Sequence, residues 1–136
     1  MPKMIFVNLP VTDLASSIHF YTAIGGSKNP QFSDETAACM VLSDTIHVML
    51  LTHTKYSSFT SRPIADARST SATLLALTVD SRDDVNATVE RAVTAGGLAD
   101  PNPPQDYGFM FSRSVQDPDG NVWEFFWMDP AAMAGS

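Results

Sequence analysis

The feature that most constrains the fold of this chain is a pattern that occurs twice. In "MIFVNLPVTDLASSIHFYTAIGG", apolar residues alternate up to Val11, and Asp13 follows as a helix cap. In "TLLALTVDSRDDVNATVERAVTAGG", the alternation runs to Val79 and Ser81 is the corresponding cap. Each segment ends in two glycines, which commonly stop helices. The repeat therefore predicts a strand followed by a helix in each half of the chain.

The remainder of each half continues the match. Two apolar strands follow the first helix, "TAACMVLS" and "TIHVMLLT", and two follow the second, "FMFSRSVQ" and "NVWEFFWM". A shorter strand is predicted before each pair, near residues 28–33 and 98–102. Each half then has the order strand, helix, three strands, which is an α+β fold made of two βαβββ modules. The alternative is an α+β domain whose halves match by chance.

The domain boundaries follow from this repeat. The first module is expected at 1–53 and the second at 73–136, with a polar linker at 54–72 that holds a helical turn near 56–59. A chain of 136 residues, 44% of them hydrophobic, is long enough to build a core for such a pair of modules.

Charge and cysteine content narrow the class of protein. The formal net charge of -7, with no basic cluster, argues against nucleic-acid binding. No apolar run reaches the roughly 18 residues of a membrane helix, and the N-terminus is too quickly polar for a signal peptide. The one cysteine, Cys39, excludes an intrachain disulfide, so a reducing compartment and a cytoplasmic location are expected.

The run "FVNLPVTDLASSIHFYTAIGG" together with "DPDGNVWEF" resembles the vicinal oxygen chelate superfamily. Its members include glyoxalase I, bleomycin-resistance proteins, the metallothiol transferases for fosfomycin and extradiol dioxygenases. The resemblance extends over essentially the whole chain. It implies a single glyoxalase-like domain over 1–136, in which two βαβββ modules curl mixed sheets around a shared cavity. It also implies a homodimer, which many members form.

The resemblance implies a metal site with one ligand from each of four strands, and Glu124 stands at one of these positions. The internal match assigns the other three to Phe6, Val48 and Leu74. None of these side chains can ligate a divalent metal. No cofactor is therefore expected, and a metal is an option only in a rearranged site that includes Glu124 or in a non-family site that His47 and His53 join. His47 is expected on the face of its strand opposite to Val48.

Strand alternation assigns the other side chains to two faces. The set expected to face the cavity is Phe6, Asn8, Ile46, Val48, Leu50, Leu74, Ala76, Val122, Glu124, Phe126 and Met128. The set expected to face the helices is Val7, Leu9, Val11, Leu75, Leu77, Val79, Trp123 and Phe125. The cavity wall is then apolar with two polar points, Asn8 and Glu124, which suits a small aromatic or aliphatic ligand.

Several side chains have alternative roles. Glu124 is a candidate general base or a partner for a cationic group, or it bonds a nearby amide or a water. Tyr107 is a candidate ligand contact or a loop anchor. Arg113 binds an anionic group of a substrate or pairs with an acid. Cys39 is expected to be an inert core thiol, and Phe20 and Tyr21 to pack the first helix on its sheet.

Three functional classes follow. The first is a metal-free protein that binds or sequesters a small organic molecule, as in the bleomycin-resistance branch of the family. The second is a lyase or dioxygenase of glyoxalase type with a rearranged metal site. The third is a metal-free enzyme that uses Glu124 as general base. Neither nucleic acid nor a membrane is an expected partner.

Overall fold

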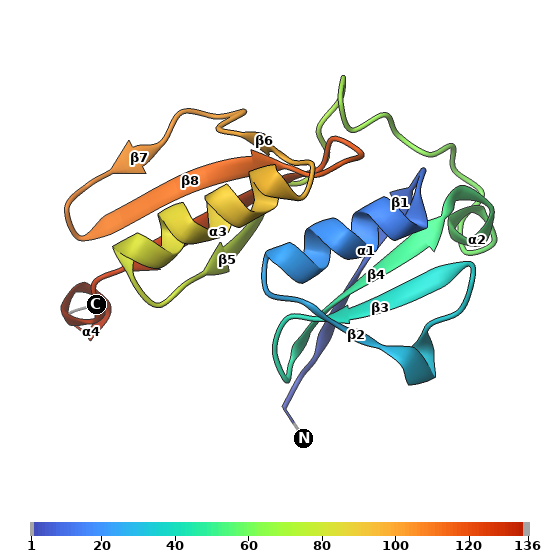
Figure 1. The fold of residues 1–136 in the computed structure, drawn as a ribbon, viewed down its shortest axis with the longest axis horizontal. Helices are drawn as coiled ribbons and strands as arrows, with labels where there is room; N and C mark the ends of the chain where they lie inside the picture. Colours follow the sequence, from blue (N-terminus) through green and yellow to red (C-terminus); the bar gives the residue numbers. More distant parts are fainter. Residues whose placement is uncertain (1, 135–136) are drawn as a thin grey trace. The chain divides into compact units, whose positions relative to one another are not determined.

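The computed structural model describes residues 2–134. The chain divides into two compact units, Met1–Asp66 and Ala67–Ser136, and each unit forms a sheet of its own (Figure 1). None of the helices in the described part of the chain is long and apolar enough to cross a lipid bilayer.

The first unit contains one mixed sheet, one long helix and two short helical segments. In chain order its elements are β1 (Ile5–Val11), α1 (Leu14–Ala23), β2 (Ser27–Asn29), the 3-10 turn η1 (Pro30–Phe32), β3 (Ala37–Val41), β4 (Ile46–Thr52) and α2 (His53–Ser57). The strand order is β1-β4-β3-β2, with β1 parallel to β4 and the other pairs antiparallel.

The second unit repeats this arrangement. Its elements are β5 (Leu75–Thr78), α3 (Arg82–Thr94), β6 (Leu98–Ala99), β7 (Gln105–Asp106), β8 (Met110–Gln116), β9 (Val122–Met128) and α4 (Pro130–Ala134). The strand order is β5-β9-β8-β6, and β7 also pairs with β8. The predicted α+β fold of two βαβββ modules is confirmed. Strand β7 was not predicted, and α2 begins three residues before the expected helical turn at 56–59.

Side-chain caps start both long helices where the sequence indicates. The Asp13 carboxylate accepts a hydrogen bond from the Ser16 amide at 3.1 Å, and the Ser81 hydroxyl accepts one from the Asp84 amide at 3.0 Å. At the end of α1, the Gly26 amide donates to the Tyr21 carbonyl at 2.8 Å. A Cβ on Gly26 would lie only 2.7 Å from that carbonyl oxygen, so the close approach requires glycine.

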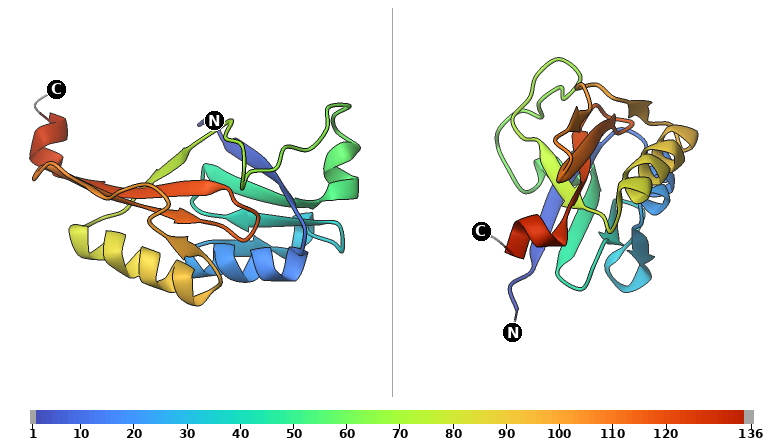
Figure 2. Two further views of the ribbon diagram at one scale, coloured as in Figure 1. Left: turned by 90° about the horizontal axis from the view of Figure 1, so that it is seen from above. Right: turned by 90° about the vertical axis from the view of Figure 1, so that its left-hand side faces the viewer.

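Each long helix covers one face of its own sheet (Figure 2). Phe20 and Tyr21 of α1 are fully buried, as predicted, and their rings meet edge to face with centroids 5.0 Å apart. In the second unit, Val85 and Val89 of α3 are buried, as is Phe125 of β9. The sheet surface that faces away from these helices is termed the open face below.

The "DPDG" turn between β8 and β9 is held by its first carboxylate. Asp117 is 2% exposed, and its Oδ1 accepts hydrogen bonds from the amides of Asp119 at 3.0 Å and Asn121 at 2.8 Å. Gly120, with φ of +99°, lies against the chain where the second unit begins, since a Cβ there would be 2.6 Å from the Arg68 nitrogen. The Arg68 side chain also donates to the carbonyl of Pro118. This turn fixes the start of β9 and hence the position of Glu124.

Candidate functional site

The open face of the second sheet is centred on Glu124. Glu124 lies in register with Ala76 of β5 on one side and Ser114 of β8 on the other. Paired residues of neighbouring strands share a face, and so do alternate residues of one strand. Val122 and Phe126 therefore lie on the same face as Glu124, as the strand alternation predicted.

The carboxylate of Glu124 has no hydrogen-bonding or ionic partner among residues 2–134, although the residue is half-buried. The hydroxyl of Ser114, the residue paired with Glu124 on β8, is already hydrogen-bonded. It donates to the Asn102 carbonyl at 3.0 Å and accepts from the Asn102 amide at 3.0 Å. The site thus presents an unpaired negative charge on an otherwise weakly polar surface.

Arg113 does not reach this carboxylate. It pairs in register with Phe125, which places it on the helix-covered face. Its guanidinium holds Asp100 through two contacts, Nη2 to Oδ2 at 2.7 Å and Nε to Oδ1 at 3.1 Å, and it donates to Asn86 Oδ1 at 3.0 Å. The Asp100 carboxylate raises the pKa of Arg113 above its ordinary value. Of the two roles predicted for Arg113, the structure contains the pairing with an acid.

The open face of the first sheet differs from the prediction by one position along β4. Phe6 pairs in register with His47, and Asn8 pairs with Met49. Val48 pairs with Val7 and is fully buried on the helix-covered face.

The predicted facing of β4 is therefore wrong. The set Ile46, Val48 and Leu50 faces α1 rather than the open side, and His47 lies on the open side. The reason is that both sets of alternate residues in "IHVMLL" are mostly apolar. The sequence of this strand therefore does not show which set faces the helix.

His47 and Phe6 form a stacked pair on this first open face. Their ring centroids are 4.3 Å apart and their planes differ by 13°. His47 is only 8% exposed, and its Nδ1 has no hydrogen-bond partner within the described chain. The side-chain Nδ2 of Asn8 donates to the Phe6 carbonyl at 3.4 Å. His47 was predicted to lie opposite to Val48 but on the helix-covered side, and the pairing register of β1 with β4 is the signal that places it on the open face.

The counterpart of Glu124 in the first unit is Met49. Met49 lies between Asn8 and Cys39, as Glu124 lies between Ala76 and Ser114. Its thioether is a soft, uncharged group. Cys39 is 1% exposed, and burial raises the pKa of its thiol.

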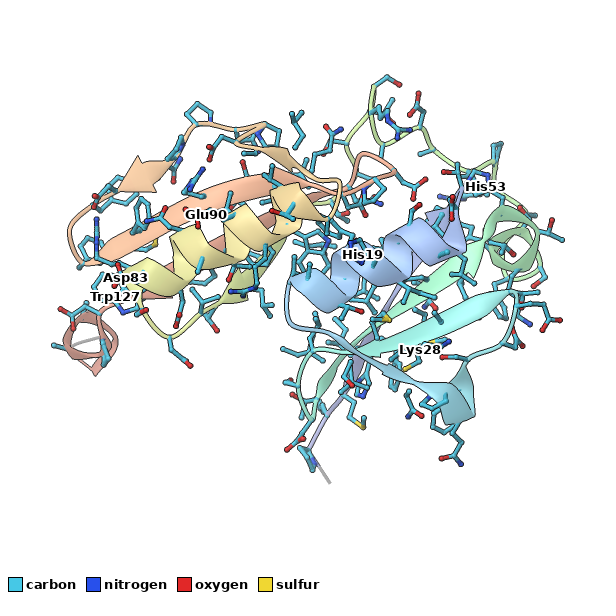
Figure 3. The ribbon with its side chains drawn as sticks, in the orientation of Figure 1. His19, Lys28, His53, Asp83, Glu90 and Trp127 are labelled. Atoms are coloured by element: carbon cyan, nitrogen blue, oxygen red, sulfur yellow. The ribbon has the colours of Figure 1, made fainter. Side chains whose placement is uncertain are left out.

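The residues present do not fit the metal of the resembled family. The four positions at which the resemblance and the sheet registers place ligands hold Phe6, Met49, Leu74 and Glu124. Only Glu124 offers an oxygen donor, whereas a divalent ion takes several oxygen or nitrogen ligands. Residues 2–134 contain no group of three His, Cys, Asp or Glu side chains arranged to hold a metal. His19 and His53 come from α1 and α2 rather than from a strand (Figure 3).

Tyr107 lies in the turn between β7 and β8. It is 58% exposed, and its ring centroid is 6.3 Å from that of Phe109. Gly108, with φ of +80°, makes the turn, and its amide donates to Asp106 Oδ1 at 2.9 Å. Tyr107 is therefore an exposed ring on a tight turn.

Two units of identical strand order, each with a helix on one face, define a glyoxalase-like fold. The sequence profile of the Glyoxalase/Bleomycin resistance protein/Dioxygenase superfamily matches residues 3–125, and the chain belongs to this superfamily.

Solved structures support the same fold. The hypothetical protein SA1046 from S. aureus is similar at a TM-score of 0.76 and 22% identity, over 93% of this chain and 95% of the other. A glyoxalase-related enzyme from Fulvimarina pelagi has a TM-score of 0.77 and 21% sequence identity, over 93% of this chain and 88% of the other. The fosfomycin resistance protein FosX from Mesorhizobium loti has a TM-score of 0.70 and 15% sequence identity, over 98% of each chain. The comparison with curated proteins found no match.

Proposed function

We propose that this protein binds a small organic molecule on the open face around Glu124, without the metal of its family. The observation that carries the proposal is the donor set. Among the four positions of the family's metal site, Glu124 alone has an oxygen to offer, and its carboxylate is unpaired in the described chain. A single carboxylate on an apolar surface orients an organic ligand, but it holds a divalent ion weakly.

The apolar residues near this face supply the remaining contact area. Leu74, directly before β5, is 57% exposed, and Phe126 is half-buried beside Glu124 on β9. Apolar contacts of this kind give affinity, and one polar group gives orientation. We also propose that binding takes place in a reducing compartment such as the cytoplasm, because the single cysteine cannot form an intrachain bridge.

The experiment that tests this proposal measures metal and ligand in one preparation. Protein purified without added metal is expected to contain no stoichiometric Zn, Ni, Mn or Fe by elemental analysis, and EDTA is expected to leave its melting temperature unchanged. A metal bound only to the folded state at a hundredfold excess over its Kd would add about 2.7 kcal/mol of stability, which melting detects. Native mass spectrometry then identifies any retained organic molecule. One metal per chain, lost from Glu124→Gln, would contradict the proposal.

A second candidate function is supported by the same unpaired carboxylate. A metal-free enzyme would use Glu124 as general base, because a base must be free to accept the proton it removes. Glu124→Gln distinguishes the two functions once a ligand is known. In a binding protein the variant changes ligand affinity, whereas in the enzyme it abolishes turnover and leaves affinity nearly intact.

A further inference from the structure

We propose that the ligand of the Glu124 site is an organic cation, held through an ammonium or guanidinium group. This inference rests on the proposed function and specifies the charge of the ligand. Its basis is the charge balance of the second unit, together with the chemistry of the surface around Glu124.

The second unit has a large excess of negative charge. Residues 67–136 contain ten Asp and Glu residues but only four arginines, and no lysine or histidine. An excess of this size produces a negative potential around the unit, which raises the local concentration of cations and lowers that of anions.

None of the four arginines of this unit is free to neutralise Glu124. Their partners in the described chain include the Pro118 carbonyl for Arg68, Asp106 for Arg82, Thr88 for Arg91, and Asp100 with Asn86 for Arg113. The positive charge that complements Glu124 therefore has to come from outside this unit.

The surroundings of Glu124 favour an organic cation over a metal ion. The residues paired with Glu124 on the adjacent strands are Ala76, which has only a methyl group, and Ser114, whose hydroxyl is already hydrogen-bonded to Asn102. Neither provides a second ligand for an inorganic ion. An ammonium or guanidinium group forms a strong charge-assisted hydrogen bond to one carboxylate. Its carbon skeleton can then lie on Val122 and the ring of Phe126, which adds apolar and cation–π contact.

Neutral and anionic ligands fit this surface less well. A neutral molecule that covered Glu124 would remove water from the carboxylate without replacing its hydrogen bonds, which costs free energy. An anion would in addition meet the negative potential of the unit. The selectivity for positive charge is therefore a property that can be measured with matched probes.

The experiment compares benzylammonium, benzyl alcohol and benzoate, which share an aromatic ring and differ in charge. Binding is followed by amide chemical shifts of β5 and β9 in the full chain, with EDTA present. The wild-type protein is expected to bind benzylammonium at least tenfold more tightly than benzyl alcohol, and benzoate most weakly. Glu124→Gln is expected to lose most of this preference and to keep only the small part that the negative potential of the unit supplies. The matched control Glu90→Gln removes the same charge from an exposed position on α3 and should keep the tenfold preference.

Three results would overturn the inference. If the wild type binds the ammonium and the alcohol with equal affinity, the inference that the ligand is a cation is wrong, while the proposed function remains in place. An undiminished tenfold preference in Glu124→Gln assigns the selectivity to the general negative potential of the unit rather than to this carboxylate. Absence of shifts with all three probes at millimolar concentration counts against both this inference and the proposed function.

Discussion

Arg82 is held at the surface of the second unit by two kinds of contact. Its guanidinium pairs with Asp106, Nη2 to Oδ2 at 2.5 Å and Nη1 to Oδ1 at 3.2 Å. It also lies over the rings of Phe111 and Trp127, at 4.7 Å and 5.7 Å from their centroids. The pair ties the start of α3 to β7, the short strand that sequence analysis did not find.

Replacement of Asp106 is expected to change how stability depends on pH. The hydrogen bonds from Arg82, and then that from the Gly108 amide, lower the pKa of the Asp106 carboxyl. A carboxyl with a lower pKa in the folded than in the unfolded state stabilises the fold above the ordinary carboxyl range. This contribution is lost as pH falls through the folded-state pKa.

The measurement is the melting temperature of Asp106→Asn and wild type between pH 7 and pH 2. The difference between the two is expected to be largest near neutral pH and to shrink in acid. Glu35→Gln, which neutralises an exposed carboxylate of the first unit, serves as control. A difference that is constant with pH would show that the ion pair is not responsible.

Cys39 is expected to resist alkylation in the folded protein. The residue is 1% exposed and burial raises the pKa of its thiol, so both the access of a reagent and the fraction of thiolate are reduced. Labelling by iodoacetamide at pH 8 should be at least about tenfold slower in buffer than in guanidinium chloride. Equal rates would mean that β3 opens readily in the folded state.

Single side chains were predictable where their neighbours in the sequence determine them. The Asp13 and Ser81 caps bond amides three residues away, so local sequence was sufficient. The facing of Val48 and the partner of Arg113 depend on strands or loops that are distant in sequence. The sequence does not give the pairing register of the strands, so such contacts could not be predicted from it. In the structure Met49, and not Val48, is the counterpart of Glu124.

At the scale of the element, the "DPDG" turn combines a special backbone conformation with a close contact. Gly120 has φ of +99°, and an added Cβ would lie 2.6 Å from the Arg68 nitrogen and 2.8 Å from the Ala67 carbonyl carbon. Both contacts are to backbone atoms, which cannot rotate away. Gly108 has a similar φ of +80° but nothing within 4 Å of the same position.

Gly120→Ala should therefore destabilise the protein more than Gly108→Ala. Positive φ costs an alanine about 1–2 kcal/mol at either position. The clash at Gly120 is expected to add about 1–3 kcal/mol. Guanidinium unfolding followed by circular dichroism measures the two losses. Equal losses would show that the chain around Arg68 moves away without cost.

Long elements were predictable from their own sequence. The strands of seven residues, β1, β4, β8 and β9, and both long helices were found from apolar runs and caps. β6 and β7 contain two residues each, too few for any alternation to be visible. β6 lies within the strand predicted near 98–102 because the internal repeat required one there, whereas β7 has no counterpart in the repeat and was missed. The 3-10 turn η1 occupies half of the segment 28–33 that was predicted as strand, and Pro30 supplies no amide for a sheet.

At the scale of the whole molecule, the exposed edge of the first sheet supports the proposal of a homodimer. β1 is an edge strand of its unit, and at its start Met4, Ile5 and Phe6 are 47%, 56% and 48% exposed. Exposed apolar edges favour association with a second copy, and closed twofold dimers are the commonest solution.

Sedimentation equilibrium at micromolar concentration is expected to give twice the 14.7 kDa of one chain. Ile5→Lys should shift the mass toward that of one chain, because it places a charge on this edge. Val93→Lys, at a 43% exposed position on α3, should leave the dimer intact. A wild-type mass of one chain would reject the proposed dimer.

The two identical strand orders also have a consequence for biosynthesis. Every strand of the first sheet comes from residues before 53, and its parallel pair joins β1 to β4, whose residues leave the ribosome last. The first sheet can therefore close while the second half is still being translated, with no strand borrowed from later in the chain. In each half the parallel pair joins the first strand to the last one, so we expect the antiparallel hairpins β3–β4 and β8–β9 to form before the sheets are complete.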